Sequence, residues 1–336
     1  MMGTDDRATL ARPVLVAISI GLLVGTAAWL LFPLSHGADF AQFHFHARNW
    51  LAGRDPYAGG FPIMRRTRVV PEPFFYPFPT LFVLAPFAVV PLQVGYALFA
   101  GASATLLAWA VLTKSPHHLP MLFSSSFILA IGLGQWTPLV TATLLIPILG
   151  WLAVVKPNVG LASAAADPSL VRIVGGGLLL LVSLGFQPNW PAEWLRNLHS
   201  MPGHPIPILV PGGVLALLAL LRWRRPEARL FIGMACVPQL MYFADQLPLW
   251  MVASTRRESM VLSAISLVAW LLALQAFNRP GGMPAFESDS LVLLGVYLPA
   301  LVILLRRDNR GNVPAPIERV AAHLPSWLRG TREGSK

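Results

Sequence analysis

Charged residues and cysteines are both scarce in this chain. Of its 336 residues only 12% are Asp, Glu, Lys or Arg, whereas soluble domains carry roughly 25%. Together with 55% hydrophobic residues and a mean hydropathy of +0.61, this scarcity excludes a disordered chain and an ordinary cytosolic enzyme. Cys236 is the one cysteine, so a disulfide-bonded scaffold is excluded as well.

The compact motifs of soluble catalysis are missing too. No Ser-His-Asp, CxxC or GxSxG pattern stands out in the sequence. Gly175-Gly176-Gly177 opens an apolar segment with no strand before it, which does not fit a phosphate-binding loop. His44 and His46 alternate too closely to share one helix face, so we expect no metal site and no cofactor.

Long apolar runs fill most of the chain instead. Because each membrane crossing needs about 20 apolar residues, we expect an all-α, polytopic transmembrane helical bundle of about 10–12 helices over residues 1–308. A basic cytoplasmic tail would follow over 309–336. Prolines and glycines break several runs, which fits either a bundle around a polar cavity or simply kinked helices. The apolar runs are 14–34, 78–91, 93–113, 121–134, 138–155, 170–186, 207–221, 229–254, 259–277 and 290–305.

The charge balance favours a membrane rather than a nucleic acid as partner. The net charge is +10, from 25 Lys and Arg against 15 Asp and Glu. The basic residues cluster between apolar runs, at 222–225, 256–257 and 306–307, where cytoplasmic anchors are expected. The first run is too long for a cleaved signal peptide. We therefore expect a multi-pass integral protein of the cell (inner) membrane that binds no nucleic acid.

The segment between the first two apolar runs, Ser35 to Pro77, is far longer than a connection requires. Within it, residues 39–50 have apolar side chains at helical spacing, which predicts an interfacial amphipathic helix with Asp39 as its N-cap. On the outer face, the loop's cations fit either an anionic ligand or lipid headgroups. These cations include Arg54, Arg65, Arg66 and Arg68.

Asp39 carries the main chemical hypothesis. A carboxylate just beyond the first helix can act as general base for a sugar hydroxyl that attacks a glycosyl phosphate. A phosphate leaving group needs no general acid, but a cation must stabilise its charge. The alternative is that Asp39 simply caps a helix.

Several short motifs, in order along the chain, resemble one family. They are Asp39-Phe40, Gly53-Arg54-Asp55-Pro56-Tyr57, Tyr76-Pro77-Phe78-Pro79, Gly134-Gln135 and Lys156-Pro157. This set is similar to the polyprenol-phosphate-mannose-dependent α-1,2-mannosyltransferases, which are glycosyltransferase family 87 enzymes of the GT-C fold. The likeness covers residues 14–160, and the rest of the chain is similar in hydropathy only. Where the family has Tyr-Pro-Pro, this chain has Tyr76-Pro77-Phe78-Pro79.

The resemblance implies a function and a set of roles. The protein would transfer a hexose, most simply mannose, from a polyprenyl-phosphate sugar donor to a glycan or glycolipid acceptor at the outer (periplasmic) face. Asp39 would be the catalytic base. The alternatives are a transporter or flippase, and a non-catalytic membrane scaffold. Donor-binding candidates are Arg54, Tyr57, Tyr76, Gln135 and Lys156, and possible cavity residues are Arg65, Arg66, Arg68, His204, Tyr242 and Asp245.

Overall fold

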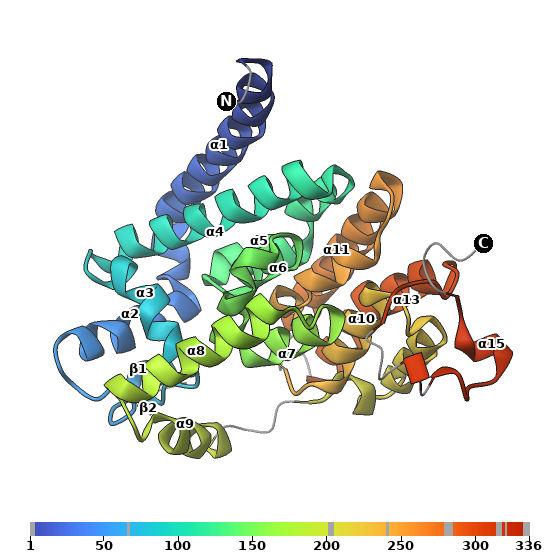
Figure 1. The fold of residues 1–336 in the computed structure, drawn as a ribbon. Coiled ribbons are helices and arrows are strands. Elements are labelled where there is room, and N and C mark those ends of the chain that lie inside the picture. Colours follow the sequence, from blue (N-terminus) through green and yellow to red (C-terminus); the bar gives the residue numbers. More distant parts are fainter. Residues whose placement is uncertain are drawn as a thin grey trace. The chain divides into compact units, whose positions relative to one another are not determined.

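The computed structural model describes residues 4–65, 68–200, 205–239, 242–278, 285–313, 318–319 and 321–331. These residues are mostly helical (Figure 1). The chain divides into two compact units, which are treated separately below. The first unit comprises residues 1–116, 127–157 and 169–203, and the second comprises 117–126, 158–168 and 204–336.

Three helices are long and apolar enough to cross a membrane. They are Ala11–Ser35, Leu92–Lys114 and Arg256–Phe277, and a bent pair, Leu170–Phe186 with Trp190–His199, makes a fourth candidate if it is counted as one span. Shorter apolar helices accompany them at Pro79–Ala88, Gly213–Arg222 and Asp289–Leu305. These lengths are compatible with a membrane protein. The larger bundle of about 10–12 crossing helices stays a prediction.

In the first unit, small residues let helices α1 (Thr4–Ser35) and α4 (Leu92–Lys114) approach closely. A Cβ atom on Gly21 would lie 2.7 Å from the Gly101 carbonyl oxygen, and one on Gly25 would lie 3.0 Å from the Ala97 carbonyl oxygen. Since residue 21 meets 101 and residue 25 meets 97, the two helices are antiparallel. Small residues four apart are typical of such close helix pairs in membranes.

The long connection after α1 folds into helix α2 (Ala38–Leu51) and a hairpin of β1 (Phe61–Arg65) and β2 (Arg68–Glu72). The hairpin is antiparallel, with Ile63 opposite Val70, and it corrects the expectation of an all-α chain. The predicted helix over 39–50 is confirmed. Its apolar face, however, packs against protein, because Phe40 and Phe43 are completely buried and contact Phe99 and Trp136.

Further helices complete the first unit. Helices α8 (Leu170–Phe186) and α9 (Trp190–His199) are joined by residues 187–189. Their axes differ in direction by 99° (Figure 1). Helix α9 lies between the apolar runs 170–186 and 207–221, so hydropathy alone does not indicate it. The elements are α3 (Pro79–Ala88), α5 (Ser125–Leu133), α6 (Thr137–Leu145), η2 (Pro147–Val155), α8 (Leu170–Phe186) and α9 (Trp190–His199).

The second unit combines one long helix, α11 (Arg256–Phe277), with several shorter helices. The apolar run 229–254 is broken, as its prolines predict: α10 ends at Cys236, and two 3₁₀ turns follow. The described part of the tail after residue 308 packs against this unit, where Trp223 Nε1 donates to the Leu328 carbonyl oxygen at 2.8 Å. The elements are η1 (Pro116–Phe123), α7 (Pro157–Ala166), η3 (Pro207–Leu209), η4 (Gly213–Arg222), α10 (Pro226–Cys236), η5 (Phe243–Asp245), η6 (Leu247–Val252), α11 (Arg256–Phe277), α12 (Ala285–Val292), η7 (Leu293–Tyr297), α13 (Leu298–Leu305) and α15 (Ser326–Arg329).

Candidate functional site

Four of the residues singled out from the sequence meet in the first unit. The side-chain amide of Gln135 donates a hydrogen bond to Asp39 Oδ2. Lys156 Nζ donates to Gln135 Oε1 at 2.8 Å, and the Tyr76 hydroxyl lies 3.5 Å from the same oxygen. We refer to Asp39, Tyr76, Gln135 and Lys156 as the Gln135 cluster. It combines a carboxylate, a primary ammonium group, a phenol and the amide that joins them.

Asp39 does not cap its helix, contrary to the sequence expectation. The N-cap of α2 is Gly37, whose φ of +77° is left-handed, and it makes no side-chain cap hydrogen bond. Asp39 lies in the first turn, where the positive end of the helix dipole favours a carboxylate. Its half-buried side chain is therefore available to bond Gln135 instead of the helix terminus.

Gln135 is held by an unusual backbone between α5 and α6. The preceding residue, Gly134, has a φ of +68°, which an L side chain rarely adopts. A Cβ atom at this position would lie only 2.5 Å from the Phe40 Cβ atom. The break between the two helices therefore approaches α2 as closely as a glycine allows. The Gly134-Gln135 pair thus has a physical reason: the glycine brings the amide to Asp39.

Lys156 follows η2 and precedes Pro157, and its backbone, with φ −134° and ψ 83°, is not helical, as expected for a residue before proline. The side chain is only 4% exposed. Burying an ammonium group costs free energy unless polar groups bind it, and the Gln135 amide oxygen is one of its partners. The amide therefore links the cation to the carboxylate. The bond from Gln135 helps to fix the orientation of the Asp39 carboxylate.

The two tyrosines predicted for the site have different roles. The ring of Tyr76 packs edge-on against Phe43 at 4.6 Å, with its hydroxyl directed to Gln135. Tyr57 is buried, and its hydroxyl donates to the Tyr76 carbonyl oxygen at 2.9 Å. Burial, helped by the nearby carboxylates Glu193 and Asp55, raises the pKa of Tyr57. Its phenol therefore stays protonated and acts as a donor to the backbone.

The other candidate residues are not joined to this cluster by any described contact. Arg54 is exposed, and its guanidinium donates to Asn49 Oδ1 at 3.1 and 2.8 Å, next to the turn after α2. Arg65 and Arg68 are paired across the hairpin by their backbones. Arg66 and His204 lie outside the described residues.

Tyr242 and Asp245 belong to the second unit, where buried amides form a separate network. Gln246 Nε2 donates to the Tyr242 carbonyl oxygen and to Gln239 Oε1, both at 3.1 Å. Gln239 in turn donates to the Tyr297 hydroxyl at 2.9 Å. Asp245 is buried in η5 beside these residues. The network joins irregular backbone after α10 to the helix at 293–297, so a structural role accounts for it.

The histidines of α2 are neutral components of the framework. His46 Nδ1 donates to the Pro56 carbonyl oxygen at 2.8 Å, and its ring lies 4.8 Å from that of Phe74. Burial lowers the pKa of His46 to about 4, even though its bonds to backbone carbonyls act in the opposite direction. Burial also lowers the pKa of His44. Among the described residues, no group of three or more His, Cys, Asp or Glu side chains could hold a metal ion.

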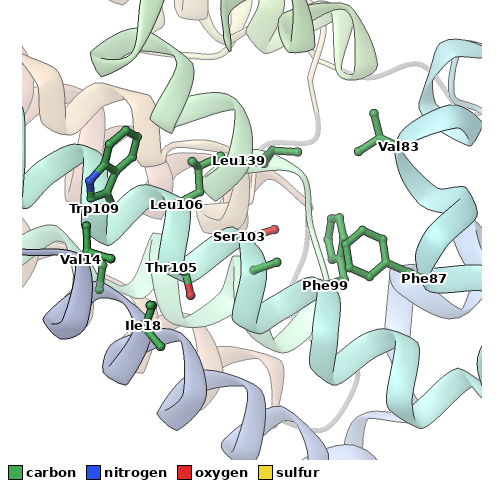
Figure 2. Close-up of a pocket in the computed structure, with 12 residues that line it drawn as sticks. Val14, Ile18, Val83, Phe87, Phe99, Ser103, Thr105, Leu106, Trp109 and Leu139 are labelled. Carbon is green, nitrogen blue, oxygen red and sulfur yellow. The ribbon is translucent and has the colours of Figure 1, made fainter. Parts of the chain in front are cut away.

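An apolar groove of about 570 Å³ opens between α1, α3, α4 and α6 (Figure 2). Two lining residues, Ser103 and Thr105, carry hydroxyl groups. The Thr105 hydroxyl donates a hydrogen bond to the Gly101 carbonyl oxygen at 2.8 Å. Phe99 forms part of the wall and also packs against Phe40 and Trp136. These two aromatic residues are the chain neighbours of Asp39 and Gln135. The lining residues are Val14, Ala17, Ile18, Val83, Phe87, Phe99, Ala102, Ser103, Thr105, Leu106, Trp109 and Leu139.

Sequence reasoning found the members of the Gln135 cluster but missed the aromatic framework that supports it. Phe99 is an ordinary member of the apolar run 93–113, Trp136 lies between the runs 121–134 and 138–155, and no local pattern distinguishes either residue. Comparisons of the chain with protein-family models, with curated proteins and with solved structures found no match. Functional arguments therefore depend on the residues and their geometry.

Proposed function

We propose that this chain is a membrane glycosyltransferase. It would transfer a hexose, with mannose as the first candidate, from a polyprenyl-phosphate sugar to a glycan or glycolipid acceptor at the outer face of the membrane. Asp39 would be the general base, and the reaction would invert the anomeric carbon.

The convergence of the Gln135 cluster is the observation that carries the proposal. Asp39 and Gln135 are 96 residues apart in the chain, and Tyr76 and Gln135 are 59 apart. Each was singled out from a separate short motif. That motif residues from distant segments share hydrogen bonds supports the interpretation that they form one site, because burying a charge such as that of Lys156 is costly without polar partners.

The cluster has the groups that a direct displacement requires. The acceptor hydroxyl oxygen would attack the anomeric carbon while Asp39 takes up the hydroxyl proton. A new glycosidic C–O bond forms as the C–O bond to the phosphate breaks, and the bonding electrons leave with the polyprenyl phosphate. Lys156 would stabilise the negative charge on that phosphate. Gln135 would hold the Asp39 carboxylate and the Lys156 ammonium group in fixed positions relative to each other.

The apolar groove supports the lipid part of the proposal. A donor with a polyprenyl chain needs a hydrocarbon surface next to a polar reaction centre. The groove has the size of a typical ligand site, roughly 300–1,000 Å³, and its wall continues through Phe99 to the aromatic neighbours of the cluster. It therefore suits a hydrocarbon chain whose polar end reaches the cluster.

The test is transfer of labelled mannose from polyprenyl-phosphate mannose in membranes that contain the protein. Asp39→Asn keeps the shape of the side chain but removes its basicity, so we expect transfer to fall by about 100-fold or more. Asp55→Asn is the matched control. Asp55 Oδ1 accepts the Tyr57 backbone N–H at 2.8 Å, and asparagine retains that acceptor, so transfer should be unchanged.

Equal transfer by Asp39→Asn and wild type would remove Asp39 from the mechanism. If membranes with the wild-type protein transfer no sugar from any polyprenyl-phosphate donor, the glycosyltransferase proposal is wrong. A transporter or a non-catalytic scaffold would then be the better explanation.

A further inference from the structure

The backbone that carries Tyr76 has no secondary structure of its own. Residues 73–76 follow β2 and lead towards α3 without helical or strand hydrogen bonding. Such a segment needs partners for its carbonyl groups. Here four successive carbonyl oxygens each accept a hydrogen bond from a side chain elsewhere in the first unit.

The donors come from both sides of the segment. Gln42 of α2 donates to the Pro73 carbonyl oxygen at 3.0 Å, and Tyr57 donates to that of Tyr76 at 2.9 Å. The two carbonyls between them bind α9. Asn197 Nδ2 donates to the Phe74 oxygen at 3.1 Å, and Trp194 Nε1 donates to the Phe75 oxygen at 2.8 Å.

Helix α9 is suited to this task by its sequence. Trp194 and Asn197 are three residues apart, so they share one face of the helix. Pro191 in the first turn and Glu193 nearby favour a helix start at this point. The sharp bend after α8 directs α9 along a different line from that helix (Figure 1), and its polar donors reach the residues just before Tyr76.

We propose that Trp194 and Asn197 are positioning residues that hold Tyr76 against the Gln135 cluster. Neither touches the cluster itself. They fix the two carbonyls that precede Tyr76, and through them the place of its hydroxyl near Gln135 Oε1. The catalytic consequence of this inference rests on the proposed glycosyl transfer, whereas its structural part does not.

The experiment compares Trp194→Phe with Trp190→Phe. Both replace an indole of α9 with a phenyl ring. Among the described residues, the indole N–H of Trp190 has no hydrogen-bond partner, although this residue is buried and its ring packs on Trp194 at 5.9 Å. The control therefore loses aromatic area without losing a bond to the segment. Asn197→Ser is a second variant that removes the other donor and leaves both indoles intact.

Hydrogen–deuterium exchange of the backbone amides of Phe74, Phe75, Tyr76 and Phe78 gives a readout that does not depend on activity. A hydrogen bond contributes about 0.5–1.5 kcal/mol, so exchange should be about threefold to tenfold faster in Trp194→Phe and Asn197→Ser. Trp190→Phe should exchange like wild type. If Trp190→Phe accelerates exchange as much as Trp194→Phe does, the loosening follows from lost packing and the proposal is overturned. Unchanged exchange in both donor variants also overturns it.

Transfer kinetics test the consequence at the cluster. We expect Trp194→Phe to lower kcat for mannose transfer about tenfold with little change in the donor KM, because Tyr76 would be misplaced rather than lost. Faster exchange with an unchanged kcat would contradict a positioning role. If exchange is faster and the wild-type protein itself transfers no sugar, the glycosyltransferase proposal fails while the anchoring of Tyr76 by α9 stands.

Discussion

The two units each bury a cation, and they satisfy it in different ways. Arg224 in the second unit is 2% exposed, and its guanidinium binds both carboxylate oxygens of Glu318 at 2.9 Å. The Arg329 carbonyl oxygen accepts a further N–H. Lys156 in the first unit is similarly buried, but it donates to a neutral amide, which in turn donates to Asp39.

The difference shows which charge is structural. The Glu318 carboxylate neutralises the charge of the Arg224 guanidinium through two parallel hydrogen bonds. This pair holds the tail segment around Glu318 against the 222–225 turn. The ammonium group of Lys156 is a compact point charge. It donates a hydrogen bond to the Gln135 amide, which donates a hydrogen bond to the Asp39 carboxylate on α2. Lys156 therefore belongs to the candidate site, whereas Arg224 holds the tail segment in place.

Removing Arg224 should therefore lower mainly the stability of the protein, whereas removing Lys156 should lower mainly its transfer activity. Arg224→Met leaves Glu318 without its bidentate partner, so we expect the free energy of unfolding to fall by about 3 kcal/mol and transfer per folded molecule to be unchanged. Lys156→Met should lower transfer by about 100-fold with a smaller loss of stability. Urea unfolding in detergent and mannose transfer measure the two effects. If both variants lose stability and transfer in the same proportion, the contrast between the two cations is wrong.

The sequence predicts the helical segments well, because long apolar runs and prolines are local signals. It also predicts that residues 39–50 form a helix, from the helical spacing of Phe40, Phe43, Ala47 and Trp50. It cannot predict that Gln135 bonds both Asp39 and Lys156, since that depends on how segments about 20 to 100 residues apart pack.

Two elements were missed for specific physical reasons. The hairpin strands hold only five residues each, too few to show a clear alternation beside the arginines and prolines of that segment. Helix α9 has mixed polarity and lies between two apolar runs, so hydropathy alone does not indicate it. The signals at its start, a proline and a glutamate in the first turn, were present and would have identified it.

The geometry that joins Gln135 to Asp39 can be tested through Gly134. Gly134→Ala must place a Cβ atom at a left-handed φ, and that atom would lie 2.5 Å from the Phe40 Cβ atom. We expect a loss of about 2–3 kcal/mol in the free energy of unfolding. The matched control is Gly53→Ala, where φ is +72° but no atom lies within 4 Å.

The control should cost only the backbone strain, about 1 kcal/mol. Urea unfolding of both variants isolates the effect of the close approach. A similar loss of unfolding free energy in the two variants would mean that α2 and residues 134–135 are not in fixed contact. The hydrogen bonds that link Lys156 to Asp39 through Gln135 would then not be maintained.

The smallest effect concerns the framework beneath Asp39, and it depends on pH. Because the folded protein keeps His46 neutral, with a pKa of about 4 against 6.5 when exposed, the unfolded chain binds more protons below pH 6.5. The stability from neutral burial is complete above that pH and declines as the pH falls from 6.5 towards 4. Between pH 7 and pH 5.5 the decline should be about 1 kcal/mol.

His46→Asn removes this titration and retains a donor for the Pro56 carbonyl oxygen, so its unfolding free energy should depend less on pH over that interval. His199→Asn, at an exposed position of α9, serves as the control and should follow wild type. Urea unfolding at the two pH values measures the difference. If His46→Asn loses as much stability as wild type on acidification, then α2 is open to water around His46, and a rigid helix presenting Asp39 to Gln135 is excluded.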